Sequence, residues 1–152
     1  MIVYRITRSD RVALDGKGAA DFPGRWNIAG EPCLYASASP SLAQLEVMVN
    51  VDDWKIFISI QYLILKIELP EDSIIKVNPM ELPSDWNDPV YNLQTQLFGS
   101  NVFKNPAMLG FSVPSAINKI EENFILNPRS NNFVDSVRVI EKVPFQIDSR
   151  LL

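Results

Sequence analysis

Residues 33–50 read CLYASASPSLAQLEVMVN, and we base the fold on this stretch of the sequence. Residues 33–37 predict a short strand, because they are apolar and aromatic and follow a segment rich in turn residues. Ser39 and Pro40 then supply an N-cap and a first-turn proline, which predict a helix running to about Asn50. A strand that passes directly into a helix indicates a chain of the α/β class.

On the N-terminal side, residues 2–7 predict a further strand, joined to the first by a connection rich in Gly and Pro over residues 15–32. Downstream, residues 59–69 predict a strand that ends at Pro70 and carries its apolar side chains on one face, namely Leu63, Leu65, Ile67 and Leu69.

Asp88 and Pro89 predict a second helix, which ends near Gly99 and buries an apolar stripe made of Val90, Leu93 and Leu97. Residues 107–113, 123–126 and 137–143 predict further short strands. Strands outnumber helices and their order is irregular. We therefore expect one domain over residues 1–152, of the α+β type, with a mixed central sheet flanked by helices.

The composition and charge of the chain limit the kinds of molecule that we expect it to bind. Hydrophobic residues make up 47% of the chain and charged residues 21%, as in an ordinary globular domain. The formal net charge is −4 and no long basic run occurs, so nucleic acid is not expected as the primary partner. No segment is apolar enough for a signal peptide or a bilayer span, and we expect a cytoplasmic protein without membrane contact.

The chain has no histidine and one cysteine, Cys33, which we interpret as a buried apolar residue. The absence of histidine excludes Ser-His-Asp and Cys-His nucleophile activation and nearly every zinc site, so no metal is expected. Glycine-rich dinucleotide or triphosphate loops are also missing from the sequence. Catalysis would have to use carboxylates, hydroxyls, Arg, Lys or Tyr.

Glu46 is the first candidate for such chemistry. It falls between Leu42 and Val49 on the helix face that also carries Leu45, so the pattern directs a carboxylate toward the core. Because a buried carboxylate requires a cation or several donors, Glu46 belongs either to a structural ion pair or to a functional site.

A second candidate is the segment of residues 24–27, which reads GRWN. It joins the bidentate cation of Arg25 to an aromatic and an amide, a combination suited to a phosphate or carboxylate. The alternative is a surface loop in which Trp26 enters the core and Arg25 pairs with a carboxylate. Taken singly, Tyr35 is consistent with a core aromatic, and Ser115 and Asn123 with ordinary turn chemistry.

The order and spacing of these motifs resemble the RES domain, a family named for its characteristic Arg, Glu and Ser. The resemblance covers nearly the whole chain. Its motifs are VYRI at 3–6, ALDG at 13–16, GRWN at 24–27, LYAS at 34–37, LAQLE at 42–46, LPSDW at 82–86, VPS at 113–115, NFILNP at 123–128, PF at 144–145 and DSRL at 148–151.

This resemblance implies an ADP-ribosyltransferase-like fold and NAD⁺ as a substrate rather than a bound cofactor. It places the family's catalytic residues on Arg25, Tyr35, Glu46 and Ser115, with Asn123 and Asn27 as further substrate contacts. Glu46 would stabilise the positive charge that develops on the ribose as nicotinamide leaves. Arg25 would hold the diphosphate or the adjacent ribose, Tyr35 would stack on nicotinamide, and Ser115 would bond the nicotinamide ribose or amide.

The activity implied is that of a bacterial toxin, an NAD⁺ glycohydrolase that arrests growth. Two alternatives keep the site and change the acceptor, to phosphate in an NAD⁺ phosphorylase or to a protein in an ADP-ribosyltransferase. A third alternative is a non-catalytic binding module. The resemblance also implies an Xre-type helix-turn-helix antitoxin that covers the active site, and it makes a homodimer plausible.

Overall fold

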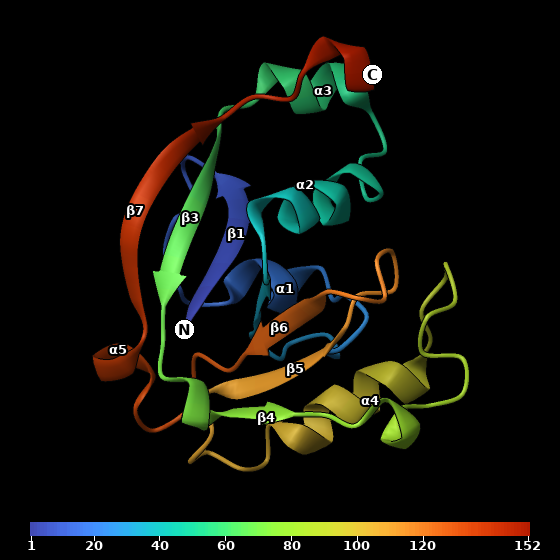
Figure 1. Ribbon diagram of the computed structural model, residues 1–152, viewed down its shortest axis with the longest axis vertical. Coiled ribbons are helices and arrows are strands. Elements are labelled where there is room, and N and C mark those ends of the chain that lie inside the picture. Colours follow the sequence, from blue (N-terminus) through green and yellow to red (C-terminus); the bar gives the residue numbers. More distant parts are fainter.

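The computed structural model describes residues 1–152 and has a single mixed sheet of seven strands with helices on its faces (Figure 1). The strand order is β4-β5-β6-β2-β1-β3-β7; β4 and β5 are parallel and every other neighbouring pair is antiparallel. The predicted fold class is confirmed. The strands are β1 (Ile2–Arg8), β2 (Leu34–Ser37), β3 (Tyr62–Glu68), β4 (Ile74–Lys76), β5 (Gly110–Pro114), β6 (Glu122–Leu126) and β7 (Arg138–Phe145).

The sheet is nearly divided between β1 and β2. These two strands share one residue pair, Tyr4 with Ser37, whereas β1 pairs with β3 along seven residues. One half of the sheet is therefore β1-β3-β7 and the other is β4-β5-β6-β2, and the two halves splay apart in Figure 1. A splayed sheet exposes side chains of both inner strands to a common space, which is where a ligand cavity can form.

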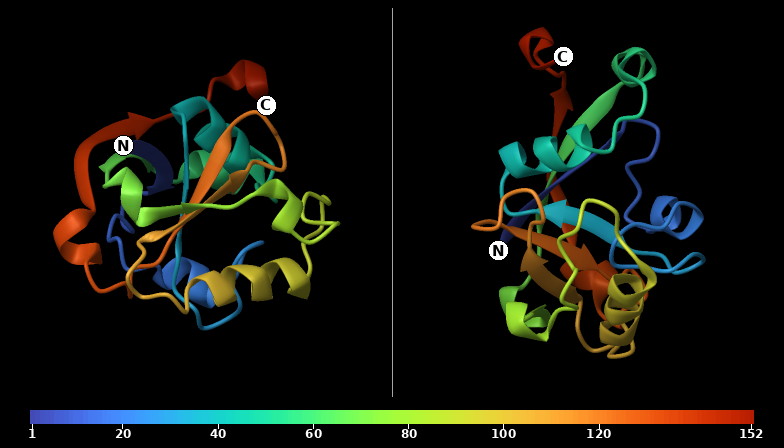
Figure 2. Two further views of the ribbon diagram at one scale, coloured as in Figure 1. Left: turned by 60° about the horizontal axis from the view of Figure 1, so that its bottom comes forward. Right: turned by 90° about the vertical axis from the view of Figure 1, so that its right-hand side faces the viewer.

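Five α-helices and two short 3₁₀ helices connect the strands, and a third 3₁₀ helix, η3 (Ser149–Leu151), follows β7. The α-helices are α1 (Lys17–Asp21), α2 (Pro40–Met48), α3 (Trp54–Ser59), α4 (Leu93–Val102) and α5 (Phe133–Ser136). Both views of Figure 2 place α1 and α4 on the same side of the sheet. They cover a core cluster that includes Trp26, Phe111 and Ile125, and the opposite face buries a cluster around Val3, Leu65 and Leu126.

Helix α2 begins as predicted. The Ser39 hydroxyl accepts a hydrogen bond from the backbone N–H of Leu42, and Pro40 occupies the first turn. Its predicted apolar face is wrong in part, because Leu45 is 41% exposed and Val49 is 62% exposed. Of that face only Leu42 is buried, together with Ala43, where α2 packs on β1 and β2.

Helix α4 starts later than predicted. Asn92, and not Asp88, caps it by accepting hydrogen bonds from the N–H groups of Gln94 and Thr95. The predicted stripe of Val90, Leu93 and Leu97 is exposed. The observed buried face of α4 differs from the predicted one because it contains Gly99. At Gly99 the helix backbone touches the loop that contains Trp26.

Four short α-helices and strands were missed. Helix α1 lies within the segment expected to be a loop, strand β4 has three residues, α3 occupies the apolar residues before β3, and α5 has four residues before β7. Helix α3 begins at Asp53, whose carboxylate accepts hydrogen bonds from the N–H groups of Lys55 and Ile56. Short segments give too few periodic positions for sequence patterns to identify them.

Gly99→Ala tests the contact between α4 and the Trp26 loop. An added Cβ would lie 1.9 Å from the Trp26 carbonyl oxygen, which is backbone and cannot rotate away. We expect a loss of about 2 kcal/mol in the free energy of unfolding, measured by urea denaturation. Gly18→Ala in α1 is the control, because nothing lies within 4 Å of its Cβ; an equal loss there would contradict the explanation.

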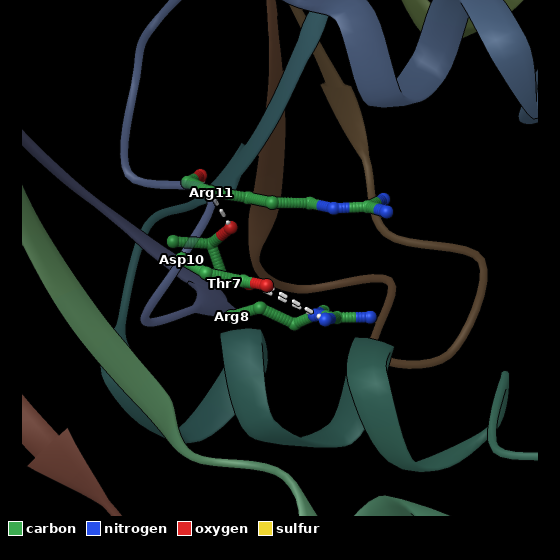
Figure 3. A network of polar contacts seen from close by, with 4 residues as sticks. All are labelled: Thr7, Arg8, Asp10 and Arg11. Carbon is green, nitrogen blue, oxygen red and sulfur yellow. Dashed lines mark hydrogen bonds and ion pairs between the residues drawn. The ribbon is translucent and has the colours of Figure 1, made fainter.

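The end of β1 is closed by a small polar network (Figure 3). Arg8 donates two hydrogen bonds to the carboxylate of Asp10, at 3.0 and 2.7 Å, and the Thr7 hydroxyl donates to the carbonyl oxygen of Arg11 at 3.0 Å. The Arg11 guanidinium makes no ion pair.

None of the helices is long and apolar enough to cross a lipid bilayer.

Candidate active site

A cavity of about 700 Å³ opens at the gap between the two halves of the sheet. Its wall is formed by β1, β2, α1, α2, the loop before β2, the segment between η2 (Pro79–Glu81) and α4, and the ends of β5 and β6 with the loop between them. A volume of this size holds a small-molecule ligand. Four of the predicted site residues line it, namely Arg25, Tyr35, Glu46 and Asn123; Ser115 and Asn27 do not, because both are completely buried behind the wall.

Glu46 projects into the cavity from α2, where Ala43, Val47 and Asn50 line the wall beside it at helical spacing. One carboxylate oxygen, Oε1, accepts hydrogen bonds from the Ser115 hydroxyl at 2.7 Å and from Asn123 Nδ2. The other oxygen, Oε2, accepts none, and it is not among the buried polar atoms without a partner. Glu46 thus presents one held oxygen and one that is open to a ligand.

The Ser115 hydroxyl has a fixed direction. It accepts hydrogen bonds from the backbone N–H groups of Ile117 and Asn118, both at 3.0 Å, so its single proton is left to donate to Glu46. The loop after β5 therefore orients the carboxylate. The predicted contact between Ser115 and the nicotinamide ribose or amide stays a prediction, and it would require Ser115 to exchange one of these bonds.

Arg25 is held by the segment that precedes α4. Its Nη1 donates to the carbonyl oxygen of Trp86 at 2.7 Å, and its guanidinium carbon lies 5.8 Å from the centre of the Tyr91 ring. Partial burial lowers the pKa of Arg25, and the negative charge of Glu46 opposes that shift. The ion pair considered between Arg25 and a carboxylate is absent, since no carboxylate oxygen lies within 4.0 Å.

Tyr35 lines the cavity and is fixed in place by Asn27, which is buried behind it. The Tyr35 hydroxyl donates to Asn27 Oδ1 at 2.8 Å and accepts from the Trp26 N–H at 2.9 Å. Asn27 also accepts from the Gly24 N–H and donates to three backbone carbonyl oxygens. A side chain at Gly24 would collide with the Tyr35 hydroxyl at 2.8 Å. Every polar atom of Asn27 is engaged, so this residue shapes the GRWN loop, and its predicted substrate contact stays a prediction.

Burial raises the pKa of Tyr35 well above its ordinary value, so the phenol stays protonated at neutral pH. A protonated phenol held by two protein partners is not a proton acceptor for catalysis. The Tyr35 ring lines the cavity, and its stacking on nicotinamide stays a prediction.

Arg5 is a cavity residue that sequence reasoning did not single out. It lies on β1, and its Nη1 donates to the Tyr35 carbonyl oxygen at 2.8 Å, across the division of the sheet. No carboxylate lies within 4.0 Å of its guanidinium. The signal was present in the alternation of β1, where Arg5 shares a face with the buried Val3 and Thr7.

The cavity therefore presents two guanidinium groups without carboxylate partners and one carboxylate without a cation. Such a wall suits a ligand with an anionic part and a part that becomes cationic. No group of three or more His, Cys, Asp or Glu side chains is arranged to hold a metal ion.

Cys33 plays no part in this chemistry. It is completely buried, and burial raises the pKa of its thiol to about 12. Because the thiolate is the reactive form, we expect the native protein to resist iodoacetamide at pH 8 and the urea-unfolded protein to react fully. Intact mass spectrometry measures both; rapid labelling of the native protein would contradict the burial of Cys33.

Comparison of the sequence with known proteins identifies the family of this chain. The family model described as "RES domain" matches residues 2–148. The chain belongs to the RES-domain family. As a RES domain it is 42% identical over 154 residues to a protein named "Toxin Res" from Photorhabdus laumondii, covering 100% of this chain and 97% of the relative. A protein of the same name from Yersinia enterocolitica is 30% identical, with 99% of each chain covered.

Two further similarities extend the comparison. A "Prs ADP-ribosylating toxin" from a Sphingobium species is 31% identical to this RES domain over 118 residues, covering 76% of this chain and 72% of the relative. Among solved structures, a chain of the MbcT–MbcA toxin–antitoxin complex of M. tuberculosis has a TM-score of 0.71 at 21% identity. The match covers 95% of this chain and 81% of that chain, and it supports the fold.

Proposed function

We propose that this RES domain is a toxin that cleaves the bond between nicotinamide and ribose in NAD⁺, with water as the acceptor. The observation that carries the proposal is the cavity wall, which combines Glu46, with one oxygen free, and two arginines that have no carboxylate partner. NAD⁺ matches both features, since it joins an anionic diphosphate to a ribose that gains positive charge as the bond breaks.

The proposed reaction needs no metal and no histidine. The electron pair of the C1′–N bond leaves with nicotinamide, which becomes neutral and requires no proton. Glu46 Oε2 stabilises the oxocarbenium-like ribose and binds a ribose hydroxyl. Water then forms the new bond to C1′ and loses a proton, and the products are ADP-ribose and nicotinamide. Ser115 and Asn123 keep Glu46 pointed at the reacting carbon throughout.

The arginines bind the rest of the molecule. Arg25, at the cavity rim, and Arg5, at the division of the sheet, each have guanidinium N–H groups left after one hydrogen bond to a backbone carbonyl. Their remaining donors suit the diphosphate oxygens, because charge-assisted bonds to phosphate favour the fork of arginine.

A second candidate function is transfer of ADP-ribose to a protein. The Sphingobium relative favours it, because its name describes an ADP-ribosylating toxin. Binding of NAD⁺ and departure of nicotinamide would be the same in both reactions, and the acceptor alone would differ.

Product analysis distinguishes the acceptors. The purified protein is incubated with NAD⁺ in phosphate-free buffer, in phosphate buffer, and with cell extract, and nucleotides and proteins are examined by mass spectrometry. Hydrolysis predicts free ADP-ribose in all three mixtures. NAD⁺ that is consumed only with extract, together with a protein that gains an ADP-ribosyl group, would replace water by a protein acceptor.

We also propose a cognate antitoxin of the Xre helix-turn-helix type as the partner. One solved structural neighbour is a chain of a complex described as a toxin–antitoxin complex. Around the cavity mouth, Phe22 is 78% exposed, Val49 is 62% exposed and Ile117 is 40% exposed, so apolar surface is available for a partner. Val49→Asp should weaken co-purification of the neighbouring helix-turn-helix gene product, while an unchanged complex would place the partner elsewhere.

A further inference from the structure

The orientation of Glu46 depends on an amide whose own orientation has to be set. Asn123 can present either its oxygen or its NH₂ group to Glu46, and an ionised carboxylate accepts hydrogen bonds but cannot donate one. A rotated amide would place Asn123 Oδ1 against Glu46 Oε1, and two acceptors would repel each other. This repulsion favours the orientation in which Nδ2 faces Glu46, and a donor to Oδ1 on the other side of the amide would hold the amide there.

Ser37 is placed to do so by the strand register. β2 and β6 are antiparallel, and Ser37 lies directly opposite Asn123 in the ladder. The Ser37 hydroxyl donates to Asn123 Oδ1 at 2.8 Å, which leaves Nδ2 to donate to Glu46 Oε1. A hydroxyl can also accept, so the carboxylate of Glu46 selects which end of the amide faces it, and the bond from Ser37 holds the amide in that place.

We propose that Ser37 is a positioning residue of the active site, which fixes the Asn123 amide so that Asn123 and Ser115 together hold Glu46 Oε1 and leave Oε2 to the substrate. The inference rests on the proposed NAD⁺ cleavage. It assigns Ser37 no substrate contact of its own, although part of Ser37 borders the cavity.

Two features support an indirect role. Ser37 is 4% exposed, and its hydroxyl is already used on Asn123. Ser37 also forms, with Tyr4, the single residue pair that joins the two halves of the sheet, and it pairs with Asn123 on its other side, so its backbone lies between two neighbouring strands. A rigid support of this kind sets catalytic geometry with little effect on the rest of the binding surface.

The first test is steady-state release of nicotinamide by Ser37→Ala, Ser37→Thr and Ser130→Ala. Ser130 is the matched control, because it is a buried serine past the other end of β6 whose hydroxyl has no hydrogen-bond partner. We expect Ser37→Ala to lower kcat about tenfold with KM within about twofold of wild type. Ser37→Thr keeps the hydroxyl and should restore most of kcat, and Ser130→Ala should behave as wild type.

The second test is independent of turnover. In ¹H–¹⁵N spectra of the whole protein, the two Nδ2 protons of Asn123 should be distinct and slow to exchange in wild type, and should broaden or exchange faster in Ser37→Ala. An unchanged kcat in a folded Ser37→Ala protein, or an increase in KM alone, would overturn the inference, and so would unchanged Asn123 signals. If wild type releases no nicotinamide, the proposed function fails, and the Asn123 signals alone then decide the role of Ser37.

Discussion

Glu46→Gln is expected to lower the rate of nicotinamide release from NAD⁺ about a thousandfold, with little change in NAD⁺ affinity. Glutamine keeps the shape of glutamate and an oxygen that Ser115 and Asn123 can still reach, so the geometry of the cavity is preserved. What it removes is the negative charge opposite the developing oxocarbenium ion. The measurement is kcat, obtained by chromatography of nicotinamide at saturating NAD⁺.

The same variant in cells checks the biological role. A strain expressing the Glu46→Gln protein should grow normally, whereas the wild-type protein should arrest growth and deplete NAD⁺. Circular dichroism and thermal unfolding provide the folding control. Growth arrest by a folded Glu46→Gln protein would mean that toxicity arises from something other than cleavage at this carboxylate.

Arg25→Gln is expected to raise the KM for NAD⁺ roughly 30- to 100-fold while kcat changes much less, because the lost interaction is with the diphosphate in both ground and transition states. Initial rates over a range of NAD⁺ concentrations measure both constants. The effect should shrink at high salt, since part of it is electrostatic attraction of the substrate.

Arg11→Gln is the matched control for Arg25. It removes the same charge from a side chain outside the cavity that makes no ion pair (Figure 3). Kinetics of this variant should resemble wild type. An equal rise in KM for both variants would show that net charge, and not the position of Arg25, determines NAD⁺ binding.

Local capping chemistry gave the start of α2 correctly but misplaced the start of α4, which Asn92 caps in place of Asp88. The Ser39 hydroxyl and Pro40 mark the start of α2 regardless of tertiary context, because their contacts lie within the same turn. The alternating residues of β3 were likewise predicted, with Leu65 and Ile67 fully buried. Helix faces were predicted less well, because Leu45 is exposed to solvent and Val49 borders the cavity where the pattern suggested packing.

In the candidate site too, local sequence patterns identified some residues, and residues whose role depends on tertiary contacts were missed. Glu46 drew attention as a carboxylate in an apolar setting, and it does project into the cavity. Arg5 and Ser37 went unrecognised, since their importance comes from strand pairing across the sheet, between residues far apart in the chain. The contacts of Arg25 with the Trp86 carbonyl oxygen and the Tyr91 ring also join residues far apart in the chain, so no sequence spacing predicts them.

The most direct test of the account is the fate of NAD⁺ mixed with the purified wild-type protein and followed by ¹H NMR. We expect free nicotinamide to appear in step with the loss of NAD⁺, and the Glu46→Gln protein to leave NAD⁺ intact over the same time. NAD⁺ that persists with a folded wild-type protein, both alone and with cell extract, would contradict the assignment of this cavity as a site of NAD⁺ cleavage.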